Sequence, residues 1–179
     1  MSNALCRTDD TVLLIVDVQE RLLPAIHDGE AVVDRCLRLA TAAGTLGVPV
    51  LGTEQYPQGL GPNVPALRAL CADTFTKRHF AATAEPGFLD WLPACRSVVL
   101  AGCEAHVCVL QTAIGLLEHD IEVKLVADAV GSRDPRNRDL ALQRLRDYGA
   151  DVVGTEMVLF EWLHTSAHPA FRTVSRLIR

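Results

Sequence analysis

SVVLAGCEAHVCVLQTAIGLLEH, residues 97–119, combines an apolar run, a short turn and the pattern of a helix. The run from Ser97 to Leu100 is typical of a buried strand, and segment 107–119 has helical periodicity. Cys108 therefore lies in the first turn of the expected helix. The unpaired N–H groups and dipole of a helix N-terminus favour negative charge, so the pKa of a cysteine there falls below its free value of about 8.5. This position makes Cys108 a candidate nucleophile.

Short apolar runs recur along the chain. They are nearly continuous rather than alternating, which is typical of strands buried on both faces of a parallel sheet. Each is too short to be told from a helix by periodicity alone, but their β-branched residues favour strands. Besides residues 97–100, the clear candidates are Val12–Val16, Pro49–Thr53 and Val123–Val126, and the weaker ones are Thr74–Thr76 and Asp151–Val153.

Helical patterns separate these strands. The pattern over residues 30–46 carries an apolar stripe and ends at Gly47, with Pro49 beyond it. Further helices are expected over residues 107–119, 138–148, 156–164 and 169–178. Strands that alternate with helices predict an α/β fold, with a mostly parallel sheet and helices on both faces. We expect one domain over residues 11–179, preceded by an N-terminal extension of residues 1–10.

Composition limits the classes of function. The chain has 179 residues, 49% of them hydrophobic, and a net charge of −5 without blocks of like charge. This balance argues against nucleic acid or an anionic membrane as a partner. The apolar run Thr11–Val16 stops at Asp17, far short of the roughly 18 residues of a membrane span. No signal-peptide pattern precedes it, so we expect a cytoplasmic protein whose six cysteines remain thiols.

Two polar residues are expected near Cys108, because ligand sites in such sheets lie at the carboxyl ends of the strands. Asp17 ends the first strand and could take the proton of an attacking thiol. The alternative for Asp17 is a loop-capping carboxylate. Lys77 follows the weak strand 74–76, where a cation would lower a thiol pKa and stabilise an oxyanion. From spacing alone, a solvated loop lysine is the better interpretation of Lys77.

Cys108 and its neighbours have other interpretations. Cys108 and, more so, Cys103 fit small buried core residues. A zinc site that combines Cys108 with His106, and with Cys103 or His119, lacks any recognised ligand spacing. We therefore predict no metal site. The chain also lacks Gly-x-Gly-x-x-Gly after a strand and Gly-Lys-Ser/Thr, so no nucleotide cofactor is expected.

Other residues near the strand ends have lesser roles. The loop Thr53–Pro62 follows the second strand and has the polar, aromatic character of a substrate-facing loop, although an ordinary surface loop fits as well. Gln19, Tyr56 and His106 are candidate pocket residues. Asp128 is expected in a turn as a capping residue.

Three separated motifs together resemble the isochorismatase-like cysteine hydrolases. They are Asp17 after the first strand, Lys77 in mid-chain, and Cys108 after Gly-x-Glu-Ala-x-Val. The resemblance spans roughly residues 11–178 and is closest to the isochorismatase domain-containing subgroup. The loop TEQYPQGLG at residues 53–61 and the segment TEMVLFE at residues 155–161 carry that closer match.

The resemblance implies a fold and a site. The fold would be a Rossmann-like three-layer α/β/α sandwich of about six strands. Asp17, Lys77 and Cys108 would form a catalytic triad, and a non-proline cis peptide would join Cys103 to Glu104. That turn would aim backbone N–H groups, including that of Cys108, at an oxyanion.

Two departures from related sequences narrow the implied activity. Zinc-binding nicotinamidases of the superfamily carry Asp-x-His near the second strand, where this chain has TEQY at residues 53–56. Phe80-Ala81 stands where the family often has Phe-Ser. True isochorismatases need no cysteine nucleophile, so Cys108 favours an amide or ester hydrolase acting on a small acyl substrate.

Two other classes remain open. The chain could be a non-catalytic oligomeric scaffold that retains the pocket, although a scaffold needs neither Asp17 nor Lys77. A thiol-redox protein would use Cys103 as the resolving partner of Cys108, but no motif recommends it. The family's habit of closed assemblies implies a homo-oligomer, a dimer or larger.

Overall fold

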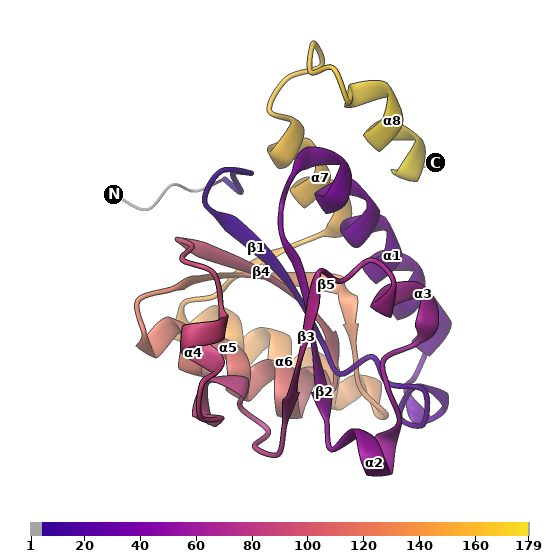
Figure 1. The fold of residues 1–179 in the computed structure, drawn as a ribbon, viewed down its shortest axis with the longest axis vertical. Coiled ribbons are helices and arrows are strands. Elements are labelled where there is room, and N and C mark those ends of the chain that lie inside the picture. Colours follow the sequence, from indigo (N-terminus) through magenta and orange to yellow (C-terminus); the bar gives the residue numbers. More distant parts are fainter. Residues whose placement is uncertain (1–4, 179) are drawn as a thin grey trace.

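A computed structural model describes residues 5–178 and contains one six-stranded parallel sheet (Figure 1). The order of its strands is β3-β2-β1-β4-β5-β6. Every neighbouring pair is parallel, which confirms the predicted α/β class. The strands are β1 (Thr11–Val16), β2 (Val50–Gln55), β3 (Asp73–Lys77), β4 (Ser97–Cys103), β5 (Glu122–Gly131) and β6 (Asp151–Val153).

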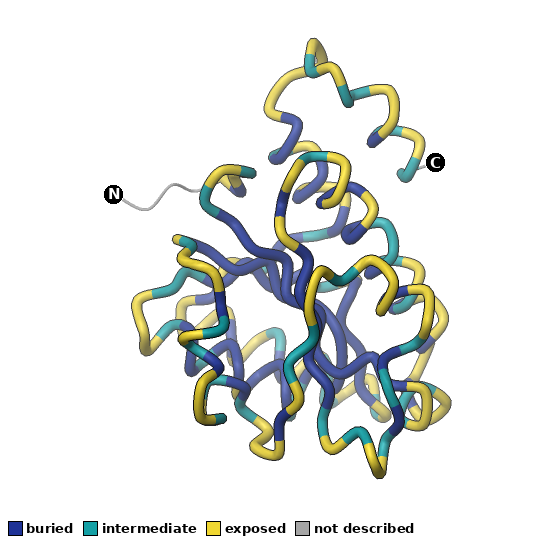
Figure 2. Tube along the Cα trace, viewed as in Figure 1, coloured by how far each residue is buried: buried dark blue, intermediate teal, exposed yellow. Residues whose placement is uncertain are grey.

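The central strands are buried along their whole length, as their continuous apolar runs predict. Every residue of β1 and β4 is buried, and these two strands form the dark centre of Figure 2. The edge strand β3 has only Lys77 buried. Burial on both faces explains why the sequence shows runs rather than alternation.

Helices cover both faces of the sheet and complete three layers (Figure 1). One face packs against α1 (Gly29–Leu46) and α7 (Thr155–Leu163), and the other against α5 (Leu110–Glu118) and α6 (Pro135–Tyr148). Within residues 5–178, no helix is long and apolar enough to cross a membrane. The shorter helices are α2 (Pro57–Leu60), α3 (Pro65–Arg68), α4 (Phe88–Trp91) and α8 (Phe171–Ser175), with 3₁₀ turns at Leu23–Ala25, Ala82–Ala84 and Arg176–Ile178.

Several helix boundaries differ from the sequence prediction. The expected helix 107–119 begins earlier, with a π-helical turn over Ala105–Val109 that runs into α5. The expected helix 138–148 begins at Pro135, because Asp134 accepts the Arg136 N–H and caps it. The expected helix 169–178 is divided into α8 and a 3₁₀ turn.

Asp128 lies inside β5, not in a turn, because that strand continues to Gly131. It does act as a cap, but of a distant helix. Its Oδ1 accepts the backbone N–H and the hydroxyl of Thr155, at 2.8 and 2.9 Å, at the start of α7.

The described part of the N-terminal extension, residues 5–10, is tied to the domain. Cys6 is buried, and its N–H donates to Glu161 Oε2 at 2.7 Å. Residues 1–4 of the predicted extension lie outside the described residues. Of residues 5–10, Cys6 therefore adds to the core at the amino ends of the strands.

A close approach between β1 and β4 needs a glycine. Gly102 pairs with Val16 and has a φ of 114°, in the region that favours glycine. A Cβ at Gly102 would stand 2.1 Å from the Val16 carbonyl oxygen. The missing side chain therefore lets the two central strands finish side by side.

Candidate active site

Three predicted site residues meet at the carboxyl edge of the sheet. Asp17 directly follows β1, Lys77 is the last residue of β3, and Cys108 lies in the turn after β4. Parallel strands end at the same edge, so these positions converge although they are far apart in sequence. The site is thus built at the point that the rule for open α/β sheets indicates.

Asp17 and Lys77 form a fully buried ion pair. Lys77 Nζ donates to Asp17 Oδ2 at 2.8 Å, and neither side chain is exposed to solvent. Nζ also lies 3.4 and 3.3 Å from the carbonyl oxygens of His79 and Phe80. The interpretation of Lys77 as a solvated loop residue is therefore wrong, because its charge is enclosed by acceptors. A buried ammonium needs such a complete set of acceptors.

Two residues of β2 complete this pair, although the sequence pattern places both in the expected substrate-facing loop 53–62 and indicates no individual role for either. Thr53 Oγ1 donates to Asp17 Oδ1 at 2.7 Å, and Gln55 Oε1 accepts from Lys77 Nζ at 2.7 Å. Thr53 and Gln55 are two positions apart on one strand, so their side chains point to the same face. Polar residues at alternate positions at the end of a buried strand are the signal that could have identified them.

Asp17 has a backbone conformation that is uncommon for a residue other than glycine. Its φ is 48°, in the left-handed region where asparagine and aspartate are the usual exceptions. This conformation turns the chain directly after β1, and the Asp17 N–H donates to the Thr53 carbonyl at 3.2 Å. Thr53 therefore fixes both the backbone and the carboxylate of Asp17.

The charges of Asp17 and Lys77 both act on the Cys108 thiol. Burial and the Asp17 charge raise its pKa to about 12, while Lys77 opposes this shift. The expectation of a lowered pKa at the helix N-terminus is therefore wrong for the free protein. The sequence shows the helix start but not the burial of the sulfur, whose residue is only 8% exposed. At neutral pH the resting group is the thiol.

The turn before Cys108 is held by charged side chains. The bond between Cys103 and Glu104 is cis, as the resemblance implies. The Glu104 carboxylate accepts the Arg133 backbone N–H at 2.9 Å and Arg133 Nε at 3.1 Å. Among the described residues, the Cys108 N–H has no hydrogen-bond acceptor outside residues 105–109.

Cys103 is buried on the other side of the sheet from Cys108. It packs in the core beneath α1, whereas Cys108 packs beneath α5. Burial raises the pKa of Cys103 well above its ordinary value. All six cysteines are free thiols. This separation argues against Cys103 as a resolving partner.

The three candidate pocket residues have different surroundings. Gln19 is fully buried, and its amide binds backbone groups of Gln55 and Gly61, so it anchors the loop after β2 and does not line a pocket. Tyr56 is 44% exposed, and the Arg78 guanidinium stacks on its ring. His106 Nδ1 lies 2.9 Å from Ser132 Oγ, within the turn that contains Cys108.

A second loop aims its carbonyl groups at Lys77. The Glu85 carboxylate accepts the backbone N–H groups of His79 and Arg78 at 2.9 and 2.8 Å, and it contacts His79 Nδ1 at 2.8 Å. These donors, chiefly His79 N–H, lower the pKa of Glu85 to about 2. Glu85 thus organises the residues whose carbonyl oxygens face the Lys77 ammonium.

A hollow of about 550 Å³ lies along the outer side of α5. His106 lines it at the end near the turn of Cys108, and Glu118, His119 and Arg144 line it further along. Cys108, Asp17 and Lys77 are not among its lining residues. In the described part of the chain, no group of three or more His, Cys, Asp or Glu residues is arranged to hold a metal ion.

Comparisons with known proteins agree with this geometry. Residues 11–157 match the model of the Isochorismatase domain. The chain is 40% identical over 173 residues to isochorismatase domain-containing protein 2 of Danio rerio, covering 96% of this chain and 88% of the relative. The bovine protein of the same name is 37% identical over 170 residues, covering 94% and 83%.

A solved structure is similar over almost the whole chain. The structure named MAR1 ribonuclease from Caenorhabditis elegans has a TM-score of 0.92 and 36% identity, covering 97% of this chain and 92% of that one. The family model and the relatives together extend over the sheet, the turn of Cys108 and the residues that surround Lys77. The chain therefore belongs to the isochorismatase-like hydrolase family.

Proposed function

We propose that the protein is a cysteine hydrolase that cleaves a small amide or related acyl compound through a thioester on Cys108. The observation that carries the proposal is the buried Asp17–Lys77 ion pair, whose two charges act on the Cys108 thiol. A buried charge pair is costly to maintain and is typical of functional sites. Its electrostatic effect on a thiol at a helix start favours nucleophilic chemistry.

In the proposed reaction, Asp17 takes the proton of Cys108 as the sulfur attacks the carbonyl carbon. A pKa of about 12 makes this transfer necessary, because few molecules carry a thiolate at neutral pH. Lys77 stabilises the thiolate and the negative charge of the tetrahedral intermediate. Backbone N–H groups of Glu104 and Cys108 would bind the oxyanion.

Collapse of the intermediate breaks the bond from carbon to nitrogen, and the leaving amine takes the proton from Asp17. Asp17 then takes a proton from water, and the resulting hydroxide attacks the thioester. This second step releases the acid and returns the proton to Cys108. All atoms come from the amide and one water molecule, so no cofactor enters the scheme.

A screen of small amides for ammonia release, combined with intact-mass detection of an acyl-enzyme, tests this proposal. We expect turnover by the wild type and none by Cys108→Ala. An acyl adduct should appear on Cys108 and on no other thiol. Turnover by Cys108→Ala at the wild-type rate would overturn the mechanism.

The alternative of a non-catalytic scaffold predicts another result. No amide would be hydrolysed, and Asp17→Asn would change none of the protein's measurable activities. The buried ion pair argues against this class, because a scaffold gains nothing from it. The ribonuclease name of one solved relative adds RNA to the screen, although a net charge of −5 disfavours a polyanion.

We also propose a homo-oligomer. Large apolar side chains are exposed on two helices, with Leu140 of α6 64% exposed and Met157 and Phe160 of α7 52% and 43% exposed. Exposed apolar surface on a helix face is typical of subunit contacts. Light scattering coupled to size-exclusion chromatography tests this, and a monomer at micromolar concentration would contradict it.

A further inference from the structure

Arg133 is held at one end of its guanidinium and open at the other. Its Nε binds both oxygens of the Glu104 carboxylate at 3.1 Å, and its backbone N–H donates to the same group at 2.9 Å. The Arg133 side chain is nevertheless 64% exposed, whereas that of Glu104 is 9% exposed. Among residues 5–178, none accepts a hydrogen bond from the two terminal nitrogens of Arg133. The guanidinium is therefore fixed in place with its outer edge free.

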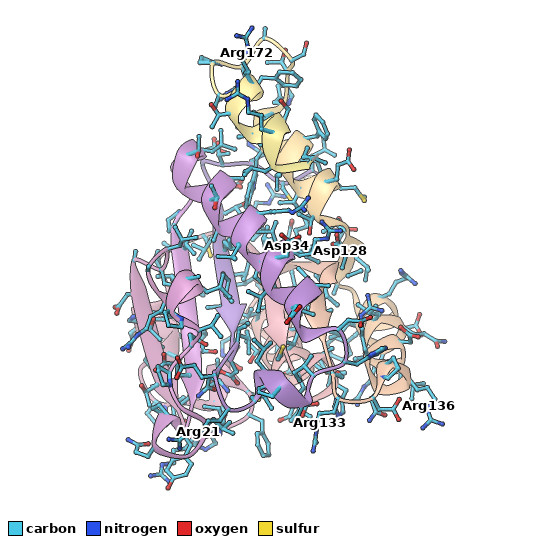
Figure 3. All side chains as sticks on the ribbon, turned by 90° about the vertical axis from the view of Figure 1, so that its right-hand side faces the viewer. Arg21, Asp34, Asp128, Arg133, Arg136 and Arg172 are labelled. Atoms are coloured by element: carbon cyan, nitrogen blue, oxygen red, sulfur yellow. The ribbon has the colours of Figure 1, made fainter. Side chains whose placement is uncertain are left out.

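This free edge lies beside the turn of the proposed nucleophile. Gly131 pairs with Cys103, and Ser132 Oγ contacts His106 Nδ1 at 2.9 Å. The segment 131–133 thus runs along the turn that leads into Cys108. Figure 3 shows Arg133 at the end of the molecule where the strands finish, with Arg172 at the opposite end.

Neighbouring arginines at this end are engaged differently. Arg136 binds Asp134 through Nε and Nη2, at 3.2 and 2.8 Å. Arg21 Nη1 lies 3.1 Å from the carbonyl oxygen of Gly59 in the loop after β2. Figure 3 shows both at the same end as Arg133. Arg133 differs because its contacts to Glu104 fix it on the turn that precedes Cys108.

We propose that Arg133 is a specificity-determining residue and that the substrate is a small amide that carries a carboxylate. This inference rests on the proposed cysteine-hydrolase function. The two terminal nitrogens of a guanidinium match the two oxygens of a carboxylate. Because Glu104 already fixes the side chain, binding costs little conformational entropy.

A protection experiment tests this proposal. Alkylation of Cys108 by iodoacetamide is followed by mass spectrometry at pH 9, in the presence of matched amides. Oxamate, malonamate and succinamate carry the carboxylate, and acetamide, propionamide and butyramide have a methyl group in its place. Ammonia release is measured in parallel samples. The proteins are the wild type, Arg133→Gln, Arg133→Lys and the control Arg136→Gln.

We expect at least one carboxylated amide to protect Cys108 at a concentration about ten- to hundred-fold lower than its neutral partner, as the loss of a charged hydrogen bond implies. Arg133→Gln should remove this difference, and Arg136→Gln should keep it. Arg133→Lys keeps a positive charge near Glu104 but loses the planar fork, so it should also lose most of the preference. If a thermal melt shows that Arg133→Gln is not folded, the Arg133→Lys variant decides the result.

Two outcomes would overturn the inference: equal protection by the charged and neutral amides in the wild type, or a preference that survives in both Arg133 variants. Ammonia release separates this failure from failure of the proposed function. Equal hydrolysis of both amide classes would leave the hydrolase standing without a role for Arg133. Arg133-dependent protection without ammonia or an acyl adduct would support the anion site and contradict the hydrolase.

Discussion

The two ends of the sheet each hold a cysteine, a carboxylate and a lysine, but they connect them differently. At the carboxyl end, Lys77 binds Asp17 directly, and the charges of both act on Cys108. At the amino end, Cys6 lies beside Glu161 and within the field of Lys124. A list of residue types would not distinguish these two clusters.

The difference lies in what each charged group contacts. Lys124 Nζ binds Asp151 at 2.8 Å, and the Asp151 side chain is 49% exposed. Glu161 accepts the backbone N–H of Cys6 at 2.7 Å and so anchors the N-terminal segment. Burial is the largest cause that raises the pKa of each cysteine, followed by the nearby carboxylate. Only Cys108 lies in the first turn of a helix, next to a carboxylate and an ammonium that bind each other.

The largest expected effect separates the two cysteines by activity. Cys108→Ala should reduce amide turnover by at least about 10³-fold, because it removes the sulfur that forms the thioester in the proposed mechanism. Cys6→Ala should leave kcat/KM unchanged, since Cys6 lies at the opposite end of the sheet. Both are measured by ammonia release on the best amide of the screen. Equal losses in the two variants would mean that the ends do not differ in function.

The second prediction concerns the charges around Cys108. Asp17 raises the thiol pKa and Lys77 lowers it, so Asp17→Asn should shift the pH profile of alkylation to lower pH and Lys77→Met to higher pH. Turnover should fall in both, because proton transfer and charge stabilisation are each lost. In Asp17→Asn, alkylation of Cys108 should therefore become faster at a given pH while amide turnover falls.

Glu161→Gln is the matched control for this prediction, because it removes a carboxylate beside the other cysteine. Breaking a buried ion pair destabilises a protein by about 3–5 kcal/mol, so each variant is first checked by thermal unfolding. Slower alkylation of folded Asp17→Asn would contradict our assignment, since it would mean that Asp17 promotes ionisation of the Cys108 thiol and does not oppose it.

A third prediction concerns the backbone that brings the site together. Gly102→Ala places a Cβ 2.1 Å from the Val16 carbonyl and forces alanine into a φ of 114°. We expect a loss of more than about 3 kcal/mol in the free energy of unfolding. Gly44→Ala in α1 meets nothing within 4 Å and should gain about 0.5–1 kcal/mol. Urea unfolding measures both, and an unchanged midpoint for Gly102→Ala would contradict the close approach.

Much of the fold was predictable because its signals are local. Continuous apolar runs identified four strands, residues 74–76 and 151–153 gave weaker signals for the two edge strands, and the alternation with helices predicted the layers. Helices α2, α3 and α4 were missed because four residues are too short to show a period. Strand β5 was predicted too short, since Asp128 interrupts its apolar run while capping α7.

The site was less predictable because its contacts are not local. Lys77 resembled a surface lysine, and its partner Asp17 is 60 residues away in sequence. Gln19 resembled a pocket residue, but its amide is consumed by the backbone of the following loop. The pKa of Cys108 depends on burial, which a helix-start pattern does not contain. The resemblance supplied the triad that the residues alone left open.

The smallest expected effect tests the amino end by itself. Glu161→Gln removes the nearest carboxylate from Cys6, so the pKa of Cys6 should fall. It should still remain above its ordinary value, because burial is the larger cause and is unchanged. Alkylation of Cys6 against pH, measured in the Cys108→Ala background, gives this shift without interference from the other thiol.

The same substitution should leave amide turnover at the wild-type level when Cys108 is present. The side-chain amide of glutamine keeps an acceptor for the Cys6 N–H, so the N-terminal segment should stay in place and stability should change by less than about 1 kcal/mol. A loss of turnover in a folded Glu161→Gln protein would show that the two ends are coupled. A Cys6 pKa at the ordinary cysteine value would show that charge, rather than burial, keeps this thiol protonated.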